Sequence, residues 1–516
     1  MAIGKMLQVL WCCVLFGFTA NFALPLDVKN SAKNSGEPMA CQSDAKACLT
    51  LSLEAMGGRE KLQAVKTFRF EAVQHTQLVE QSYKQDPFIT SYERIKGAVD
   101  LEGGRMRLDV HTTWPEADPG TAESDSTLVF GPEGGVTRAA NGDSPCGLSS
   151  LDESRQLLEL GPMRLLLTAQ QAPDLHLQTT ETIRGTAHPV LAFQWHGTPV
   201  RILLNPFNHL PDAYETVQAF HDHWYQWGDV RQRVYLENWQ TFHGVIFPTN
   251  QVEERNGVLW RSTQVIALEL QPSVSEADLK MDAAVARKSA QGRGWDWEFT
   301  AKDSVALAPG VTLYLDAWNS TVVEQEDGMM ILEAPISGRY TKGVIEEARR
   351  KHPGVPVKAV LSTSDSWPHV GGVRQAVALD LPVYMLDLNQ PLLERMVAAP
   401  HTLHPDALQE TPHKPRWQIV SGKVTIGTGK NRMELYPLRG GSTERQYMVY
   451  FPEHHLLYAS DTLALNDDGS LYDPELMREV IQAVKREGLE VTTVFAMHQG
   501  PVAWSSVVAQ VQKAMS

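Results

Sequence analysis

Histidine pairs are among the features of this chain that could support chemistry, and the first such pair is His221 and His223. Two imidazoles separated by one residue can ligate one metal ion. This pair, however, lies beside Trp224, Tyr225 and Trp227 in the first half of the chain. We therefore interpret the segment as an exposed aromatic loop rather than a metal site.

The sequence lacks common motifs for nucleophilic and phosphate chemistry. No G-x-S-x-G elbow presents a serine nucleophile, and no G-x-x-x-x-G-K-[ST] loop is available for a phosphate. No Cys-x-x-Cys pair exists, so neither a cysteine zinc site nor a thioredoxin-type redox motif is expected. We interpret two further histidine groups, near prolines or at a turn, as solvated surface: His401, His404 and His413, and His454 and His455.

Length and charge narrow the class of protein. The chain has 516 residues, with 46 Lys and Arg against 61 Asp and Glu, and a formal charge of −15. At about 100–200 residues per domain, this length corresponds to two to four folded units. An acidic surface repels phosphate backbones, and the sequence has no basic stripe, so nucleic acid is not an expected partner.

The N-terminus has the form of a secretory signal peptide. Lys5 is the only charged residue before Asp27, and Met6–Ala23 is almost entirely apolar. We expect a signal peptide at 1–23, a polar tether at 24–43, and an exported protein that is periplasmic or secreted. An uncleaved anchor is the alternative, because the apolar stretch is just long enough to span a bilayer. No later stretch is long and apolar enough to span a bilayer, so no stable membrane span is expected after the signal is removed.

Cysteine usage agrees with export. Cleavage after the signal leaves Cys41, Cys48 and Cys146. The first two are close enough in sequence to form a small disulfide loop in an oxidising compartment, which would leave Cys146 over. Three free thiols are the alternative.

A β-rich domain is expected over residues 44–275. Alternating polar and apolar residues from Thr67 to about Ile266, as at 68–72 and 105–110, predict many strands of a largely antiparallel sheet. One helix is predicted over 151–170.

Parts of this region resemble the curved-sheet domain of bacterial lipoprotein carriers. The resemblance is carried by LSLEAMGGREKLQAVKTFRFEA, by Gly228-Asp229-Val230 and by YLENWQTFHGVIFPTNQVE. It implies an antiparallel half-barrel that holds an acyl chain or packs on a neighbour, and it implies no catalytic residue. The partner it implies is a small-molecule or lipid-like ligand.

A second domain is expected over residues 299–516, after a charged linker at 276–298 that contains glycine. Strand, helix and hairpin patterns alternate, which indicates two sheets with helices outside, an α/β/β/α layering. The overall class is therefore α+β. The predicted helices lie at 342–351 and from Gln390, the strands at 357–362, 383–386, 433–438, 446–451 and 491–496, and a hairpin at 417–425.

This second half resembles the metallo-β-lactamase fold from about Phe299 to Ser516. Members of that family usually carry T-H-x-H-x-D-H-x-G-G after a strand, a further His before a strand ending in Tyr-x-Pro, an Asp after the next strand and a last His. The matching segments here are TSDSWPHVGG, STERQYMVYFPEHHLLYASDTL and FAMHQGPV. In register, the frame is kept, but more than half of the family's metal ligands are replaced.

The resemblance implies one depleted metal site. His369, Asp461 and His498 stand at retained ligand positions and supply two imidazoles and a carboxylate, which is the ligand count of a catalytic mononuclear zinc with an open water position. Serine is a weak zinc ligand, so the family's first metal is expected to be absent. The replaced positions are Ser364, Ser366 and Ser442 for histidines and Pro368 for the aspartate.

Two functions follow from this sequence. In the first, the protein is a hydrolase that uses one zinc ion held by His369, Asp461 and His498, while Ser364, Ser366 or Ser442 hydrogen-bonds water or substrate. In the second, it is a non-catalytic binding or assembly protein that keeps the fold without metal. The sequence does not decide between an enzyme and a binding protein, and it does not identify a substrate.

Overall fold

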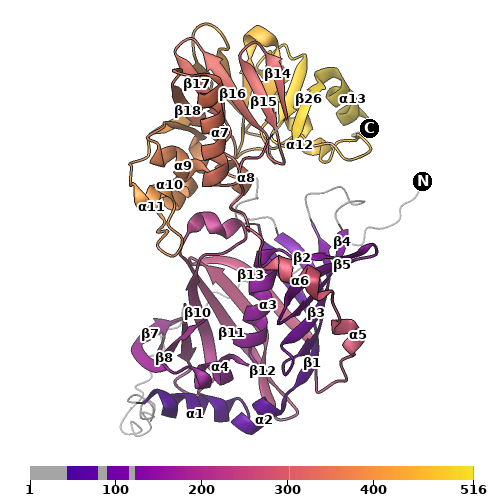
Figure 1. Cartoon of the computed structure of the whole chain (residues 1–516), viewed down its shortest axis with the longest axis vertical. Helices are drawn as coiled ribbons and strands as arrows, with labels where there is room; N and C mark the ends of the chain where they lie inside the picture. Colours follow the sequence, from indigo (N-terminus) through magenta and orange to yellow (C-terminus); the bar gives the residue numbers. More distant parts are fainter. Residues whose placement is uncertain (1–43, 79–89, 115–122, 302, 515–516) are drawn as a thin grey trace, which may run out of the picture.

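The structure is a computed structural model that describes residues 44–78, 90–114, 123–301 and 303–514. The predicted signal peptide and tether lie outside these residues. The described chain forms a 13-stranded sheet in its first half and sheets of seven and six strands in its second half. Figure 1 shows the two halves stacked along the long axis of the molecule.

The first half is an antiparallel sheet in which successive strands are mostly neighbours. The predicted strands at 68–72 and 105–110 are confirmed within β1 and β3. The chain builds β1 to β6 toward one edge and β7 to β13 from the other, so that β13 pairs with β1. The strands are β1 (Thr67–Gln77), β2 (Thr90–Asp100), β3 (Arg105–Thr113), β4 (Glu123–Gly131), β5 (Gly134–Ala139), β6 (Gly142–Pro145), β7 (His176–Ile183), β8 (Thr186–Trp195), β9 (Thr198–Leu204), β10 (Pro211–Gln218), β11 (Val230–Phe242), β12 (Val245–Arg255) and β13 (Val258–Leu270).

Helices cover one face of this sheet. Their buried leucines join the sheet residues in one hydrophobic core, and Figure 1 shows α3 lying across the strands. The predicted helix over 151–170 is two helices, because Gly161 takes an extended conformation and Pro162 follows it. The helices are α1 (Ala45–Ala55), α2 (Arg59–Ala64), α3 (Leu148–Leu160) and α4 (Leu165–Gln171).

The stretch predicted as a linker at 276–298 contains the helices α5 (Glu276–Leu279) and α6 (Ala283–Ser289). Helix α6 packs against β5 and β6, where Ala286 is fully buried and Ser289 Oγ accepts the backbone N–H of Gly135 at 3.1 Å. This part of the stretch therefore belongs to the first half of the molecule.

The second half is a sandwich of two sheets between helices, as the sequence predicts. The inner faces of both sheets share one core, which includes Leu313, Leu361, Val449 and Phe495. A second cluster packs α7 to α11 on the outer face of the seven-stranded sheet, and a third packs α12 and α13 on the six-stranded sheet. The helices are α7 (Gly338–Lys351), α8 (Trp367–Val370), α9 (Val373–Ala378), α10 (Gln390–Ala398), α11 (Ala407–Glu410), α12 (Pro474–Arg486) and α13 (Trp504–Ala514).

The predicted hairpin at 417–425 is wrong. Strand β20 pairs in parallel with β19 in the first sheet, whereas β21 pairs with β22 in the second. The short polar turn between them carries the chain from one sheet to the other. The strands are β14 (Asp303–Ala308), β15 (Val311–Leu315), β16 (Ser320–Gln325), β17 (Gly328–Leu332), β18 (Val357–Leu361), β19 (Val383–Leu386) and β20 (Trp417–Val420) in the first sheet, and β21 (Val424–Ile426), β22 (Met433–Pro437), β23 (Tyr447–Phe451), β24 (Leu456–Tyr458), β25 (Thr493–Ala496) and β26 (Gln499–Ala503) in the second.

The two halves meet at the 3-10 helix η1 (His223–Trp227), which is not the exposed aromatic loop predicted from its composition. Trp224 is 1% exposed and belongs to the same hydrophobic cluster as α7, α8 and α9 of the second half. The ring of His223 lies 6.1 Å from that of Trp367 in α8. The Tyr225 hydroxyl donates to the carbonyls of Ile336 and Gly371.

A second contact between the halves involves Asp229 and the loop after α10. The Asp229 carboxylate accepts the backbone N–H groups of Thr402 at 3.0 Å and Leu403 at 2.9 Å. His401 is 6% exposed and faces the carbonyl of Gln226 at 3.2 Å, so its prediction as solvated surface is wrong. Burial lowers the pKa of both His223 and His401 to about 4, which keeps both rings neutral at the interface.

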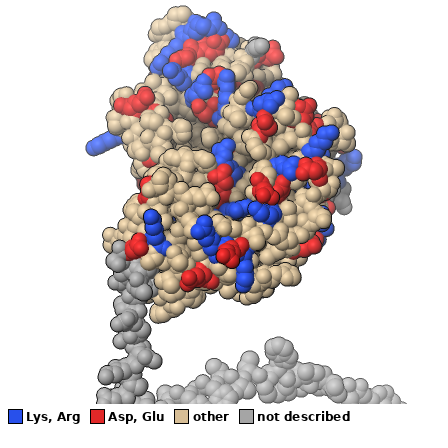
Figure 2. Space-filling view, turned by 60° about the horizontal axis from the view of Figure 1, so that its bottom comes forward, with Lys and Arg blue, Asp and Glu red and all other residues tan. Residues whose placement is uncertain are grey.

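Charged side chains are mixed on the surface. Figure 2 shows Lys and Arg interspersed with Asp and Glu on the face in view, without a continuous basic stripe.

Of the cysteines in the described chain, Cys48 is disulfide-bonded and Cys146 is free and buried. Cys41 lies outside the described residues. Burial raises the pKa of the Cys146 thiol to about 11, so this thiol is unreactive at neutral pH. No helix among the described residues is long and apolar enough to cross a membrane.

Replacing Trp224 by Ala is expected to destabilise the protein by ~3–5 kcal/mol, because a buried aromatic ring at the contact between the halves would be lost. Urea unfolding followed by tryptophan fluorescence and circular dichroism measures the change. Phe207→Ala is the control, because Phe207 is 84% exposed. Equal effects of the two substitutions would contradict the assigned role of η1.

Candidate functional site

The loop after β18 places the first of the predicted site residues. Strand β18 ends at Leu361, and the chain then passes through Ser362–Ser366 into α8, which carries His369. The two glycines after α8 permit close packing: a Cβ on Gly371 would lie 2.2 Å from the carbonyl oxygen of Ile336, and one on Gly372 would lie 1.8 Å from Thr341 Oγ1. This contact holds α8 against the segment that follows β17.

The three predicted metal ligands lie together, in a row of ionic contacts. His369 Nε2 lies 3.6 Å from Asp461 Oδ1, and His498 Nε2 lies 3.1 Å from the same oxygen. On its other side, His369 Nδ1 lies 3.0 Å from Oε2 of Glu333. The row runs from the core outward, since the Glu333 and His369 side chains are fully buried while those of Asp461 and His498 are 15% and 33% exposed.

Glu333 is the member of this row that sequence reasoning missed. It follows the four buried residues that end β17 and is fully buried itself. Its Oε1 accepts from the hydroxyls of Thr363 and, at 3.1 Å, Tyr458. A carboxylate directly after the apolar run MMIL was the available signal, because such a residue is buried only when it has partners.

The backbone around this row is strained. Glu333, Ile336 and Ser460 have φ values of 82°, 57° and 57°, in the left-handed region that disfavours side chains. Each such residue costs on the order of 1–3 kcal/mol, and such residues cluster at functional sites. Ser460 Oγ lies 2.7 Å from Thr363 Oγ1, which links the turn before Asp461 to the loop after β18.

Opposite charges set the protonation states in the row. Burial alone would disfavour the imidazolium, but Glu333 and Asp461 outweigh it and raise the pKa of His369 to about 10. Burial also acts against ionisation of Asp461, yet His369 and His498 hold the pKa of this carboxyl well below its usual range. At neutral pH, His369 is therefore a cation between two carboxylates.

The predicted serines do not join this row. Ser364 and Ser366 are buried in the loop after β18, where Ser364 Oγ accepts the backbone N–H of Ser366 at 3.2 Å. Ser442 lies on a turn held by α12, since its backbone N–H donates to both oxygens of Glu479. Within the described residues, none of the three hydroxyls forms a hydrogen bond with His369, Asp461 or His498.

The arrangement of donors in this row differs from that of a metal site. Both ring nitrogens of His369 face carboxylates, and one Asp461 oxygen lies between the two histidines. Among the described residues, no group of three or more His, Cys, Asp or Glu is arranged so that it could hold a metal ion. As they are placed, His369, Asp461 and His498 do not fit a metal, and the zinc ion stays a prediction.

A second candidate site is a cavity of about 370 Å³ between α3 and the antiparallel sheet. Residues of eight strands line it, because one face of each strand points toward the cavity. Its lining changes along the strands from apolar to polar. The apolar end includes Phe70, Met106, Leu108, Leu128, Phe130 and Val265, and the polar end includes Gln74, Glu93, Thr112, Gln251, Glu253, Arg261 and Thr263.

The side chains of helix α3 that face the cavity also change from polar to apolar along the helix. Ser150 and Glu153 near its start face the polar end, and Leu157 near its end contributes to the apolar end with Met163. Gln156 between them donates to the Tyr214 hydroxyl at 3.0 Å and to Gln232 at 2.8 Å. The cavity therefore has the lining that an amphiphilic molecule requires.

We predict that His369 is an imidazolium at pH 8 in metal-free protein and that Glu333→Gln lowers its titration midpoint from near 10. Because folding raises this pKa above its unfolded value of about 6.5, the stabilisation is complete below pH 6.5 and is lost as the pH rises toward 10.

The ¹⁵N shifts of the His369 ring measure its protonation directly, and urea unfolding between pH 6.5 and 10 measures the linked stability. Glu326→Gln at the exposed β16–β17 turn is a control for loss of one carboxylate. A neutral His369 ring at pH 8 would contradict the assigned ion pairs.

Comparisons with known proteins match only part of this chain. No protein-family model and no curated protein sequence matches it. Similar solved structures include the DIM-1 metallo-beta-lactamase (16% identity, 42% of this chain and 99% of that chain, TM-score 0.32) and a metallo-beta-lactamase from Pontibacter korlensis (14%, 41% and 98%, 0.33). FIM-1 from Pseudomonas aeruginosa in its mono-zinc form is a third (14%, 43% and 96%, 0.33).

These solved structures resemble one part of the chain, and the sandwich architecture predicted for its second half is seen in the structure. The two packed sheets and the helices outside them form the expected α/β/β/α sandwich from β14 to α13. The resemblance of the first half to lipoprotein carriers stays a prediction. The fold does not by itself assign an activity to the chain.

Proposed function

We propose that the protein is a binding protein for an amphiphilic small molecule, which occupies the cavity between α3 and the antiparallel sheet. The observation that carries this proposal is the lining of about 370 Å³, apolar at one end and polar at the other. Burial of an alkyl chain contributes about 0.8 kcal/mol per methylene, which supplies the affinity, while the polar end orients the ligand. The proposed setting is the periplasm or the extracellular space, after removal of residues 1–23.

The metallo-β-lactamase-like half, in this proposal, is not a metal-dependent hydrolase. Three of its histidine ligand positions hold Ser364, Ser366 and Ser442, whose neutral hydroxyls bind zinc weakly. Of the two remaining imidazoles, that of His369 forms ion pairs with Glu333 and Asp461, and that of His498 lies 3.1 Å from Asp461. Metal binding would have to displace a proton from the His369 ring.

Hydrolysis with one zinc ion is the second candidate function, and one observation favours it. His369 Nε2 is buried without a hydrogen bond and faces Asp461, beside His498. His369, Asp461 and His498 would have to leave their present ion pairs to hold a zinc ion, which would supply an activated water.

Metal analysis separates the two candidates. Full-length protein equilibrated with zinc and passed through a desalting column is expected to retain zinc far below one equivalent, with no change in His498→Ala. About one equivalent of zinc that is lost in His498→Ala would overturn the metal-free proposal and support the hydrolase.

Binding of neutral alkyl glucosides to the full-length protein tests the cavity. Affinity is expected to increase with chain length from hexyl to decyl, by up to about 0.8 kcal/mol per methylene. Val265→Trp should weaken binding at least about tenfold, because Val265 lines the cavity and is 8% exposed.

Ile266→Trp is the matched control, because this neighbour on β13 is 60% exposed and does not line the cavity. Leu108→Phe is a milder filling variant in case Val265→Trp does not fold. Equal binding by all variants, or no binding by the folded wild type, would contradict the proposal.

A further inference from the structure

The polar end of the cavity is a continuous row across five strands. The pairing of residues is Thr112 with Glu93, Glu93 with Gln74, Gln74 with Thr263, and Thr263 with Gln251. All five residues line the cavity. The position of the row at one end of the cavity places the head group of an amphiphile there.

Glu93 supplies a carboxylate that no cation among the described residues contacts directly, although Arg261 attracts it at longer range. Its carboxylate accepts hydrogen bonds from three uncharged groups, Gln74 at 3.2 Å, Thr76 at 3.3 Å and Ser91 at 2.7 Å. Within the described residues, Glu93 forms no ion pair. These donors fix the carboxylate in place and leave its charge available to a ligand.

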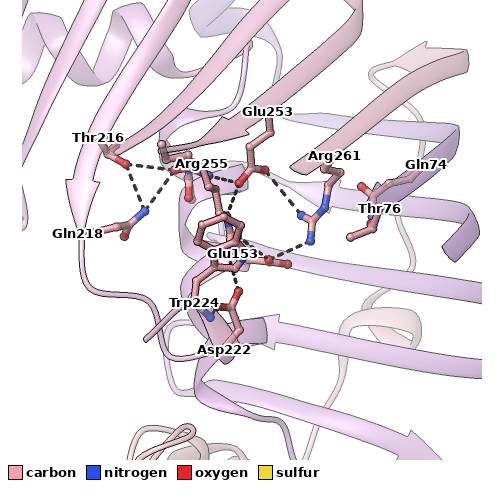
Figure 3. A network of polar contacts seen from close by, with 12 residues as sticks. Gln74, Thr76, Glu153, Thr216, Gln218, Asp222, Trp224, Glu253, Arg255 and Arg261 are labelled. Atoms are coloured by element: carbon pink, nitrogen blue, oxygen red, sulfur yellow. Dashed lines mark hydrogen bonds and ion pairs between the residues drawn. The ribbon is translucent and has the colours of Figure 1, made fainter. Parts of the chain in front are cut away.

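Arg261 is the guanidinium that lines the cavity, and it is already shared between two carboxylates. Its Nη2 lies 3.1 Å from Glu153 and its Nη1 lies 4.0 Å from Glu253. Figure 3 shows Arg261 between these carboxylates on one side and Gln74 and Thr76 on the other. An anionic head group would have to compete with both carboxylates for this cation.

The second guanidinium of the network, that of Arg255, does not reverse the negative charge at the polar end of the cavity. Arg255 is fully buried behind the lining and pairs with Asp222 at 2.7 Å, with Glu253 at 2.8 Å and with Glu153 at 3.7 Å. Burial acts against ionisation of Glu253, but Arg255 and Arg261 outweigh it and lower its pKa, so this carboxylate is charged. At the cavity, the carboxyl groups of Glu93, Glu153 and Glu253 outnumber the guanidinium groups of Arg261 and Arg255, so this end of the cavity is acidic overall.

We infer that the cavity binds an amphiphile with a cationic head group, such as an alkylammonium, whose nitrogen lies beside Glu93 and whose alkyl chain lies along Leu108 and Leu128. This inference rests on the proposed function and adds the class of head group. Attraction between a partly buried charge pair exceeds that in bulk water several-fold, so the charge of the head group should decide among ligands with the same chain.

Three ligands with one decyl chain test the inference on full-length protein: decyltrimethylammonium, decyl glucoside and decyl sulfate, each below its micellar concentration. Calorimetric titration is expected to give affinity about tenfold higher for the ammonium than for the glucoside, and weakest for the sulfate. The preference should decrease at high salt, because ions screen the carboxylates.

Glu93→Gln is expected to remove most of the ammonium preference while the affinity for decyl glucoside stays within about twofold. Glu71→Gln is the control, because it removes the same charge from the opposite face of β1. Glu153→Gln is the second variant if Glu93→Gln does not fold.

The outcomes distinguish a failure of the inferred head-group class from a failure of the proposed ligand-binding cavity. Equal binding of ammonium and glucoside, or an ammonium preference unchanged in both Glu93→Gln and Glu153→Gln, would overturn the inference and leave the cavity proposal standing. Tightest binding of the sulfate would assign the head group to Arg261 instead. No binding of any decyl ligand would overturn the proposed function as well.

Discussion

The buried guanidinium of Arg255 is the interaction on which both the cavity and the contact between the two halves depend. It is 0% exposed and pairs with Glu253 on the cavity side and with Asp222 on the interface side. Asp222 in turn caps η1 by accepting the backbone N–H of Trp224 at 2.8 Å. The guanidinium also lies 3.8 Å from the ring centroid of Phe220 and 4.9 Å from that of Trp260. A buried cation with this many partners is costly to leave unpaired, so these elements are fixed together.

The aromatic contact then connects the first half to the retained histidine. The η1 segment packs against α8, and the Tyr225 hydroxyl donates to the carbonyls of Ile336, in the segment after β17, and of Gly371, directly after α8. His369 lies within α8, and its partner Glu333 lies three residues before Ile336. The row from Glu333 to His498 is therefore built on a loop that the first half helps to position. The two candidate sites share this support, although different residues form them.

Sequence patterns predicted the helices and strands that local residue order determines. The alternation at 68–72 and 105–110 and the strand at 383–386 correspond to β1, β3 and β19. The α/β/β/α layering also follows from the order of elements. The hairpin at 417–425 fails because pairing with distant strands decides which sheet a short strand joins, and local composition does not show this. Trp224 and His401 were predicted at the surface for the same reason, since only the contact between the halves buries them.

The candidate site was predictable in its positions and not in its interactions. The family register brought His369, Asp461 and His498 together, but it does not include the long-range ion pair with Glu333. The cavity was implied only as a general capacity for an acyl chain, because its polar end depends on the register of five strands. Glu93 and Glu153 are far apart in sequence, and folding brings both into the lining of one cavity.

A crystal structure of the full-length protein with decyltrimethylammonium tests most directly whether the cavity binds a cationic amphiphile. We expect the alkyl chain beside Leu108 and Leu128 and the ammonium nitrogen beside Glu93. A ligand bound in the metallo-β-lactamase-like half beside His498 and Ser364, with the cavity between α3 and the sheet free of ligand, would contradict it.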